Sequence, residues 1–142
     1  MDLINRLLNT RFWLMAMGAL LSAFTIIGFA TGAIVTGAQD FWSEPLSESE
    51  MNIAIVVELA WNAHILGMGI ILLALGLLAA NPVRARIGAI AVVAVMGSQF
   101  LAAGASAAYG YGGFNGLNLV ALAIMIVPLI TLIACLTKLN AR

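Results

Sequence analysis

The chain has 142 residues, of which 63% are hydrophobic and only 8% are charged, and its mean hydropathy is +1.10. Soluble domains carry about 25% charged residues, and a domain of this length buries only about two-thirds of its chain surface. The composition therefore excludes an ordinary water-soluble fold. The formal net charge of zero gives no reason to expect nucleic acid or another polyanion as a partner.

Four apolar runs follow one another along the chain, and each reaches the roughly 20 residues that cross a bilayer as a helix. They lack the two-residue alternation of barrel strands. The first run exceeds the roughly 7–15-residue apolar core of a signal peptide, so we expect a retained span. We predict an all-α integral membrane protein with one domain, 1–142, built as a four-transmembrane-helix antiparallel bundle with spans at about 12–36, 53–80, 87–108 and 117–136.

The basic residues fix the expected orientation, because Lys and Arg accumulate in cytoplasmic segments. All six fall on one side of the predicted bundle. They are Arg6 and Arg11 before the first run, Arg84 and Arg86 between the second and third, and Lys138 and Arg142 after the fourth. We therefore predict cytoplasmic N- and C-termini, in the plasma (inner) membrane of a bacterium.

Two local signals mark the ends of the second span. Ser47 and Glu50 have the spacing of a capping box, which predicts that a helix begins there. Asn81-Pro82 is a turn signal that ends the helix. Because the link to the third span is short, we expect the second and third spans to pack as an antiparallel hairpin.

Small residues recur at helical spacing in three of the runs, and such stripes allow helices to approach closely in lipid. We expect them to pack the bundle internally, with a subunit interface on one of them as the alternative. The stripes are Gly18-x-x-x-Ser22 and Gly28-x-x-x-Gly32 in the first run, Ala60, Ala63 and Gly67 in the second, and Ala94, Ser98, Ala102 and Ser106 in the third.

Polar residues inside a membrane are costly and are candidates for function. At ~1.5 Å per residue from the nearest cytoplasmic anchor, Thr25, His64 and Gln99 lie about 20–25 Å deep, which places all three in the outer half of the bilayer. Glu58 and Asn62 fall higher, near the outer interface. The five residues form the predicted polar intramembrane cluster.

His64 is the only histidine, and it supports two interpretations. In the first, its neutral ring is hydrogen-bonded to Gln99, to Thr25 or to a backbone carbonyl. In the second, His64 is the axial ligand of a haem or chlorophyll, and Ala60 and Gly67 leave room for the flat ring. The Ala-x-x-x-His spacing resembles the ligand motif of bacterial light-harvesting polypeptides over five residues, and those polypeptides have one span rather than four.

No sequence motif for catalysis is present, since HExxH, CxxC, phosphate-loop and nucleophile-elbow patterns are all missing. One histidine is too few for a zinc site. We therefore predict a small non-catalytic membrane protein without a cofactor that acts as an oligomer or as an accessory subunit of a larger membrane complex. The first alternative is a cofactor-binding subunit that uses His64, and the second is a small transporter or channel with a polar path near Glu58, His64 and Gln99.

Overall fold

The computed structural model describes residues 6–42, 44–108 and 119–140, and no strand occurs in these ranges. This confirms the all-α class. The elements are α2 (Thr10–Thr31), α3 (Ala33–Thr36), the 3-10 helix η1 (Gly37–Phe41), α4 (Glu48–Leu78), α5 (Val83–Ala108) and α6 (Leu119–Leu136).

Three helices in the described part of the chain are long and apolar enough to cross a membrane. They are α2, α4 and the Val83–Ala102 part of α5, as expected of a helical membrane protein. The predicted fourth span, 117–136, corresponds to α6, where a shorter apolar stretch, Met125–Leu136, is found. The first two residues of that predicted span lie outside the described residues.

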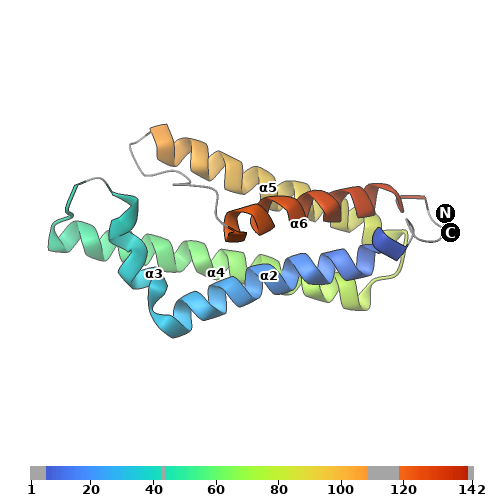
Figure 1. The fold of residues 1–142 in the computed structure, drawn as a ribbon, viewed down its shortest axis with the longest axis horizontal. Helices are drawn as coiled ribbons and strands as arrows, with labels where there is room; N and C mark the ends of the chain where they lie inside the picture. The colour runs from blue at the N-terminus through green and yellow to red at the C-terminus, as the bar shows by residue number, and fades with distance from the viewer. Residues whose placement is uncertain (1–5, 43, 109–118, 141–142) are drawn as a thin grey trace.

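The helix of the first span ends earlier than the predicted residue 36. It ends at Thr31, and Gly32 follows in the left-handed conformation with φ 71°. Glycine adopts this conformation without the steric cost that a Cβ brings, and it commonly terminates helices. The chain then folds back through α3 and η1 onto the first turns of α4 (Figure 1).

The predicted capping box at the start of α4 is confirmed. The helix begins at Glu48, directly after Ser47. The Glu50 carboxylate accepts hydrogen bonds from the Ser47 backbone N–H at 2.9 Å and from the Ser47 hydroxyl at 2.6 Å. These bonds satisfy groups that a helix end otherwise leaves unpaired.

Helices α2 and α4 form the most extensive contact of the bundle, and their backbones touch. A Cβ added at Gly18 would lie 2.6 Å from the Gly69 carbonyl oxygen, and one added at Gly69 would overlap the Ser22 hydroxyl. On α4 the buried residues Asn62, Gly69 and Gly76 recur every seventh position. This is the repeat of two helices that cross at a small angle.

The prediction that the second and third spans pack along each other as a hairpin is wrong. Helix α5 packs mainly on α6, which also contacts α2, whereas α4 and α5 touch over a short length and diverge away from their connecting turn (Figure 1). The buried cluster joins α2, α4, α5 and α6 on the side of that turn. Its members are Leu14, Met17, Leu72, Val92, Val95 and Cys135.

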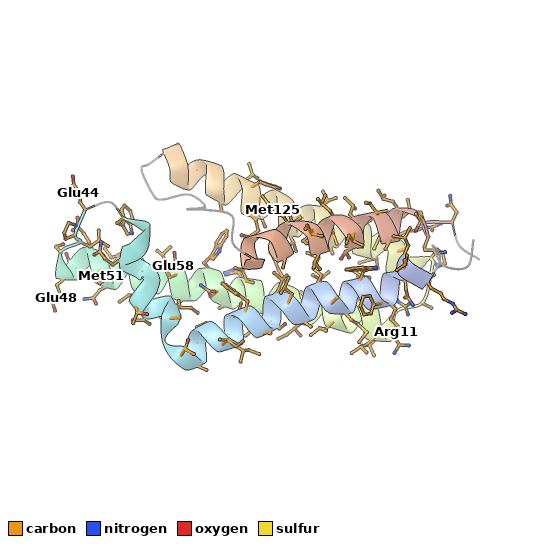
Figure 2. The ribbon with its side chains drawn as sticks, in the orientation of Figure 1. Arg11, Glu44, Glu48, Met51, Glu58 and Met125 are labelled. Carbon is orange, nitrogen blue, oxygen red and sulfur yellow. The ribbon has the colours of Figure 1, made fainter. Side chains whose placement is uncertain are left out.

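Opposite charges lie at opposite ends of the molecule. Arg11 lies at one end of the bundle, and Glu44 and Glu48 lie at the other (Figure 2). At the basic end, the start of α2, the end of α6 and the α4–α5 turn come together (Figure 1). Two hydrogen bonds tie these segments, from the Thr10 hydroxyl to Asn81 Oδ1 at 3.2 Å and from Arg86 Nε to the Leu139 carbonyl at 3.0 Å.

Candidate functional site: a cleft between two helices

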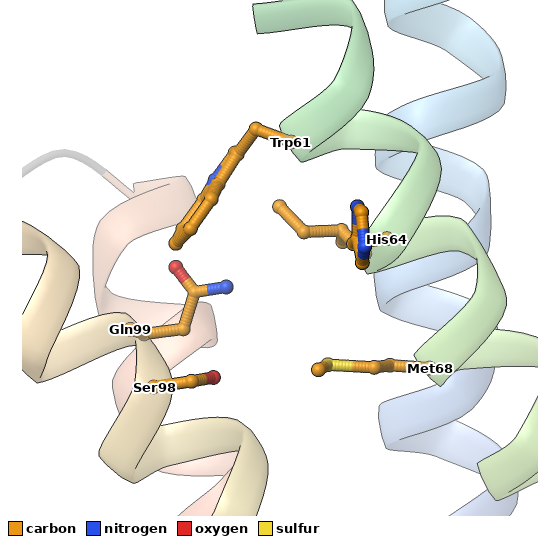
Figure 3. Close-up of a pocket in the computed structure, with 6 residues that line it drawn as sticks. Trp61, His64, Met68, Ser98 and Gln99 are labelled. Atoms are coloured by element: carbon orange, nitrogen blue, oxygen red, sulfur yellow. The ribbon is translucent and has the colours of Figure 1, made fainter. Parts of the chain in front are cut away.

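A cleft of about 310 Å³ opens where α4 and α5 diverge. Because α5 packs on α6 instead of following α4, the facing side chains of α4 and α5 are left apart (Figure 3). The lining residues are Trp61, His64, Ile65 and Met68 from α4, and Ser98 and Gln99 from α5.

The α4 side of the cleft is a single helix face. Its four residues have the spacing i, i+3, i+4 and i+7, which brings side chains to the same side of a helix. The face is apolar apart from the imidazole and the indole N–H. No charged side chain lines the described part of the cleft.

His64 is exposed on α4, and its ring is held by a local hydrogen bond. The Nδ1 atom lies 2.8 Å from the Ala60 carbonyl oxygen, one helical turn earlier. A carbonyl only accepts, so the ring carries its proton on Nδ1. The other ring nitrogen, Nε2, keeps its lone pair in the neutral imidazole. The bond to Ala60 is one of the three kinds of bond that the sequence predicted for His64.

Gln99 lies across the cleft from His64, and its side chain points toward Trp61 (Figure 3). The neighbouring Ser98 hydroxyl donates to the Val95 carbonyl of its own helix at 2.9 Å. Two members of the predicted polar cluster, His64 and Gln99, therefore meet in one cleft although they belong to different helices.

The other three members of the cluster, Thr25, Glu58 and Asn62, are not among the described residues that line the cleft. Thr25 is fully buried on α2, and its hydroxyl donates to the Leu21 carbonyl at 3.0 Å. Asn62 is buried on the side of α4 that faces α2, and its amide donates to the Glu58 carbonyl at 2.9 Å. The predicted cluster is therefore divided, with only His64 and Gln99 in the cleft.

Ala60 and Gly67, predicted to flank a cofactor, lie beside His64 but do not line the cleft. Ala60 is exposed and contributes its carbonyl to the His64 ring. A Cβ added at Gly67 would meet nothing within 4 Å.

The first of the three small-residue stripes makes a close helix contact. The Gly18–Ser22 pair packs on α4 as expected, while Gly32 ends α2 instead of packing it. In the second stripe Ala63, like Ala60, is exposed. In the third, Ala94 is exposed and Ser98 lines the cleft; the side chain of Ser106 is outside the described part.

Sequence reasoning did not identify Trp61 and Met68 as site residues. They lie three residues before and four after His64, and this spacing alone indicates that they share its face. The residue type of Trp61 was a usable signal, because aromatic side chains commonly line ligand pockets. Met68 carries no such signal, since its type is equally typical of packed interiors.

Comparison of the chain with protein-family models, curated proteins and solved structures gives no match. In the described part of the chain, no group of three or more His, Cys, Asp or Glu side chains comes close enough to hold a metal ion. The cleft offers one imidazole, an amide and apolar walls, a combination suited to binding.

Proposed function

We propose that this protein is a non-catalytic integral-membrane protein of four spans that acts as an oligomer or as an accessory subunit of a larger membrane complex. In this proposal both termini lie in the cytoplasm, and the membrane is the bacterial inner membrane. The separation of the basic end from the acidic end supports the orientation (Figure 2).

One observation carries the proposal. Helix α4 has two sets of small residues, and among the residues that the structure describes, neighbouring helices pack against only one of these sets. Gly69 and Gly76 are buried against α2. Ala60, Ala63 and Gly67 lie on another side of α4 and are open. Gly67 and Gly69 are two positions apart, which turns them about 200° from each other around the helix.

The open set is suited to a further helix because helix association in lipid depends on close approach. Small residues allow two backbones to come together, so that van der Waals packing and short hydrogen bonds stabilise the pair. The α2–α4 contact shows that this chain uses such packing within itself. Around the open set lies an apolar surface on α4 that includes Ile53, Val57 and Ile71, each more than half exposed.

Replacing Ala63 with leucine is expected to break the assembly. The added side chain would occupy the space that the neighbouring helix needs. Overpacking of this kind costs about 1–3 kcal/mol, which corresponds to a loss of roughly 5- to 160-fold in association. We expect the wild-type protein, extracted in a mild detergent, to have a mass above that of the monomer by light scattering and by native mass spectrometry.

The matched control is Ala23→Leu, which makes the same change at an exposed alanine of α2. We expect Ala23→Leu to assemble like the wild type and Ala63→Leu to be monomeric. A monomeric wild-type protein, or an Ala63→Leu assembly with unchanged mass, would contradict the proposal. The wild-type protein can also be recovered together with a different membrane subunit. If that complex is lost only in Ala63→Leu, the protein is an accessory subunit rather than an oligomer of itself.

A further inference from the structure

We infer that the α4–α5 cleft binds a metal-containing tetrapyrrole, with Nε2 of His64 as the axial ligand of the metal. This goes beyond assembly through the open α4 surface, because the cleft and the small residues lie on adjacent sides of α4. Three features of the molecule support it: the state of the imidazole ring, the number of available ligands and the shape of the cleft.

The His64 ring is already in the form that binds a metal. A histidine that ligates through one nitrogen nearly always donates its other ring N–H to a carbonyl or carboxylate, which fixes the tautomer and the orientation. In His64 the Nδ1–H donates to the Ala60 carbonyl at 2.8 Å. The remaining nitrogen, Nε2, is an acceptor and cannot donate a hydrogen bond while the ring is neutral.

The number of ligands then selects the kind of metal. A bare Zn²⁺ or a comparable ion takes three or four protein ligands, and the described residues hold no cluster of three candidate side chains. A metal inside a tetrapyrrole brings four nitrogen ligands of its own. It needs only one from the protein, as in haem proteins with a proximal histidine. A single intramembrane imidazole satisfies that need.

The walls of the cleft suit a flat, apolar ring. Trp61 and Met68 lie about one turn before and after His64 on the same face of α4, and Ile65 adds a further apolar wall (Figure 3). The volume of about 310 Å³ lies at the small end of the range for ligand sites, roughly 300–1,000 Å³. His64 and Trp61 are exposed at the rim, so the edge of a larger ring can extend into the lipid.

The test uses the purified full-length protein in detergent micelles and three probes. Ferric protoporphyrin IX and zinc protoporphyrin IX each offer a metal with an open axial position, and metal-free protoporphyrin IX is the control. We expect saturable one-to-one binding of the two metal-containing rings, with a displaced Soret band. The metal-free ring should bind at least about tenfold more weakly, since a metal–imidazole bond is missing.

His64→Gln should remove the Soret displacement and weaken binding of the metal-containing rings by at least about 10- to 100-fold. Removing a residue that only hydrogen-bonds to a metal ligand already costs this much affinity, so removing the ligand itself should cost no less. The control variant Leu78→Ala changes an exposed leucine at the end of α4 that does not line the cleft, and it should bind like the wild type. Circular dichroism and thermal melting of each variant establish that it is folded.

Three results would overturn the inference: no saturable binding by folded wild-type protein, equal binding of metal-free and zinc protoporphyrin, or a folded His64→Gln protein with an unchanged Soret shift. Every readout is spectroscopic and does not require an assembled protein. A failure of tetrapyrrole binding would therefore leave the assembly proposal intact, and a monomeric protein would leave the tetrapyrrole inference intact. When the protein is purified from its own membranes, analysis of the extracted pigment shows whether the bound ring contains iron or magnesium.

Discussion

Replacing Gly69 with alanine is expected to destabilise the bundle by about 1–3 kcal/mol, the usual cost of forcing an extra group into a packed interior. The new Cβ would lie 2.9 Å from the Gly18 carbonyl oxygen and 3.0 Å from the Ser22 backbone nitrogen. These are backbone atoms, so no side-chain rotation relieves the overlap, and α2 and α4 have to move apart. The measurement is the free energy of unfolding in mixed micelles titrated with SDS, followed by circular dichroism.

The control for this change lies two residues earlier on the same helix. Gly67→Ala adds the same methyl group where nothing lies within 4 Å. We expect it to leave the unfolding free energy of the monomer unchanged or slightly higher, because alanine is the better helix former. If Gly69→Ala proved as stable as Gly67→Ala, the close α2–α4 contact would not exist.

Replacing Leu14 with alanine is expected to cost about 2 kcal/mol, the lower end of the range for buried leucines. Leu14 is completely buried and belongs to the apolar cluster that joins α2 to α4, α5 and α6. In a bilayer the transfer part of the usual cost is small, since lipid is as apolar as the protein interior. The cavity and the lost dispersion contacts remain.

Leu78→Ala is the matched control for Leu14→Ala. Leu78 is 86% exposed at the end of α4, so its removal creates no cavity, and the unfolding free energy should stay within the error of the wild-type value. The same SDS titration measures both variants. Equal losses in the two would mean that the cluster around Leu14 contributes no packing energy of its own.

The sequence predicted the helices well because their signals are local. Apolar runs of sufficient length indicated the helical class, and Ser47 with Glu50 indicated the start of α4, which the structure places at Glu48. The end of the first helix was missed because Gly32 also completes a Gly-x-x-x-Gly pattern. That pattern suggested packing, whereas the backbone uses the freedom of glycine to adopt a φ of 71°.

Helix pairing was less predictable, since it depends on which small residues meet. Nothing along the chain distinguishes Gly69, which packs on α2, from Gly67, which faces open space. The short α4–α5 link suggested that the two helices pack together. A short turn holds the ends of two helices close to each other, but it does not determine the angle between their axes. The resulting divergence creates the cleft, which no local pattern indicates.

The candidate site was predicted in part. Counting the rise per residue placed His64, Gln99 and Thr25 at a common depth, but depth says nothing about direction around the helix axis. His64 and Gln99 line the same cleft, while Thr25 is buried on α2 and bonds to Leu21 of its own helix. The imidazole likewise bonds within its own helix, to the Ala60 carbonyl, because a backbone acceptor one turn away is close whichever way the neighbouring helices pack.

The orientation of the chain in the membrane is tested most directly by labelling single cysteines in intact cells with an impermeant maleimide. Cys135 is replaced with alanine beforehand, and one cysteine is introduced at either Glu48 or Arg84. Glu48 is the first residue of α4, and Arg84 lies in the first turn of α5, just after the connection that follows α4. We predict that Glu48→Cys reacts from outside and that Arg84→Cys reacts only after the cells are lysed. Labelling of Arg84→Cys in intact cells, with Glu48→Cys protected, would contradict the cytoplasmic placement of both termini.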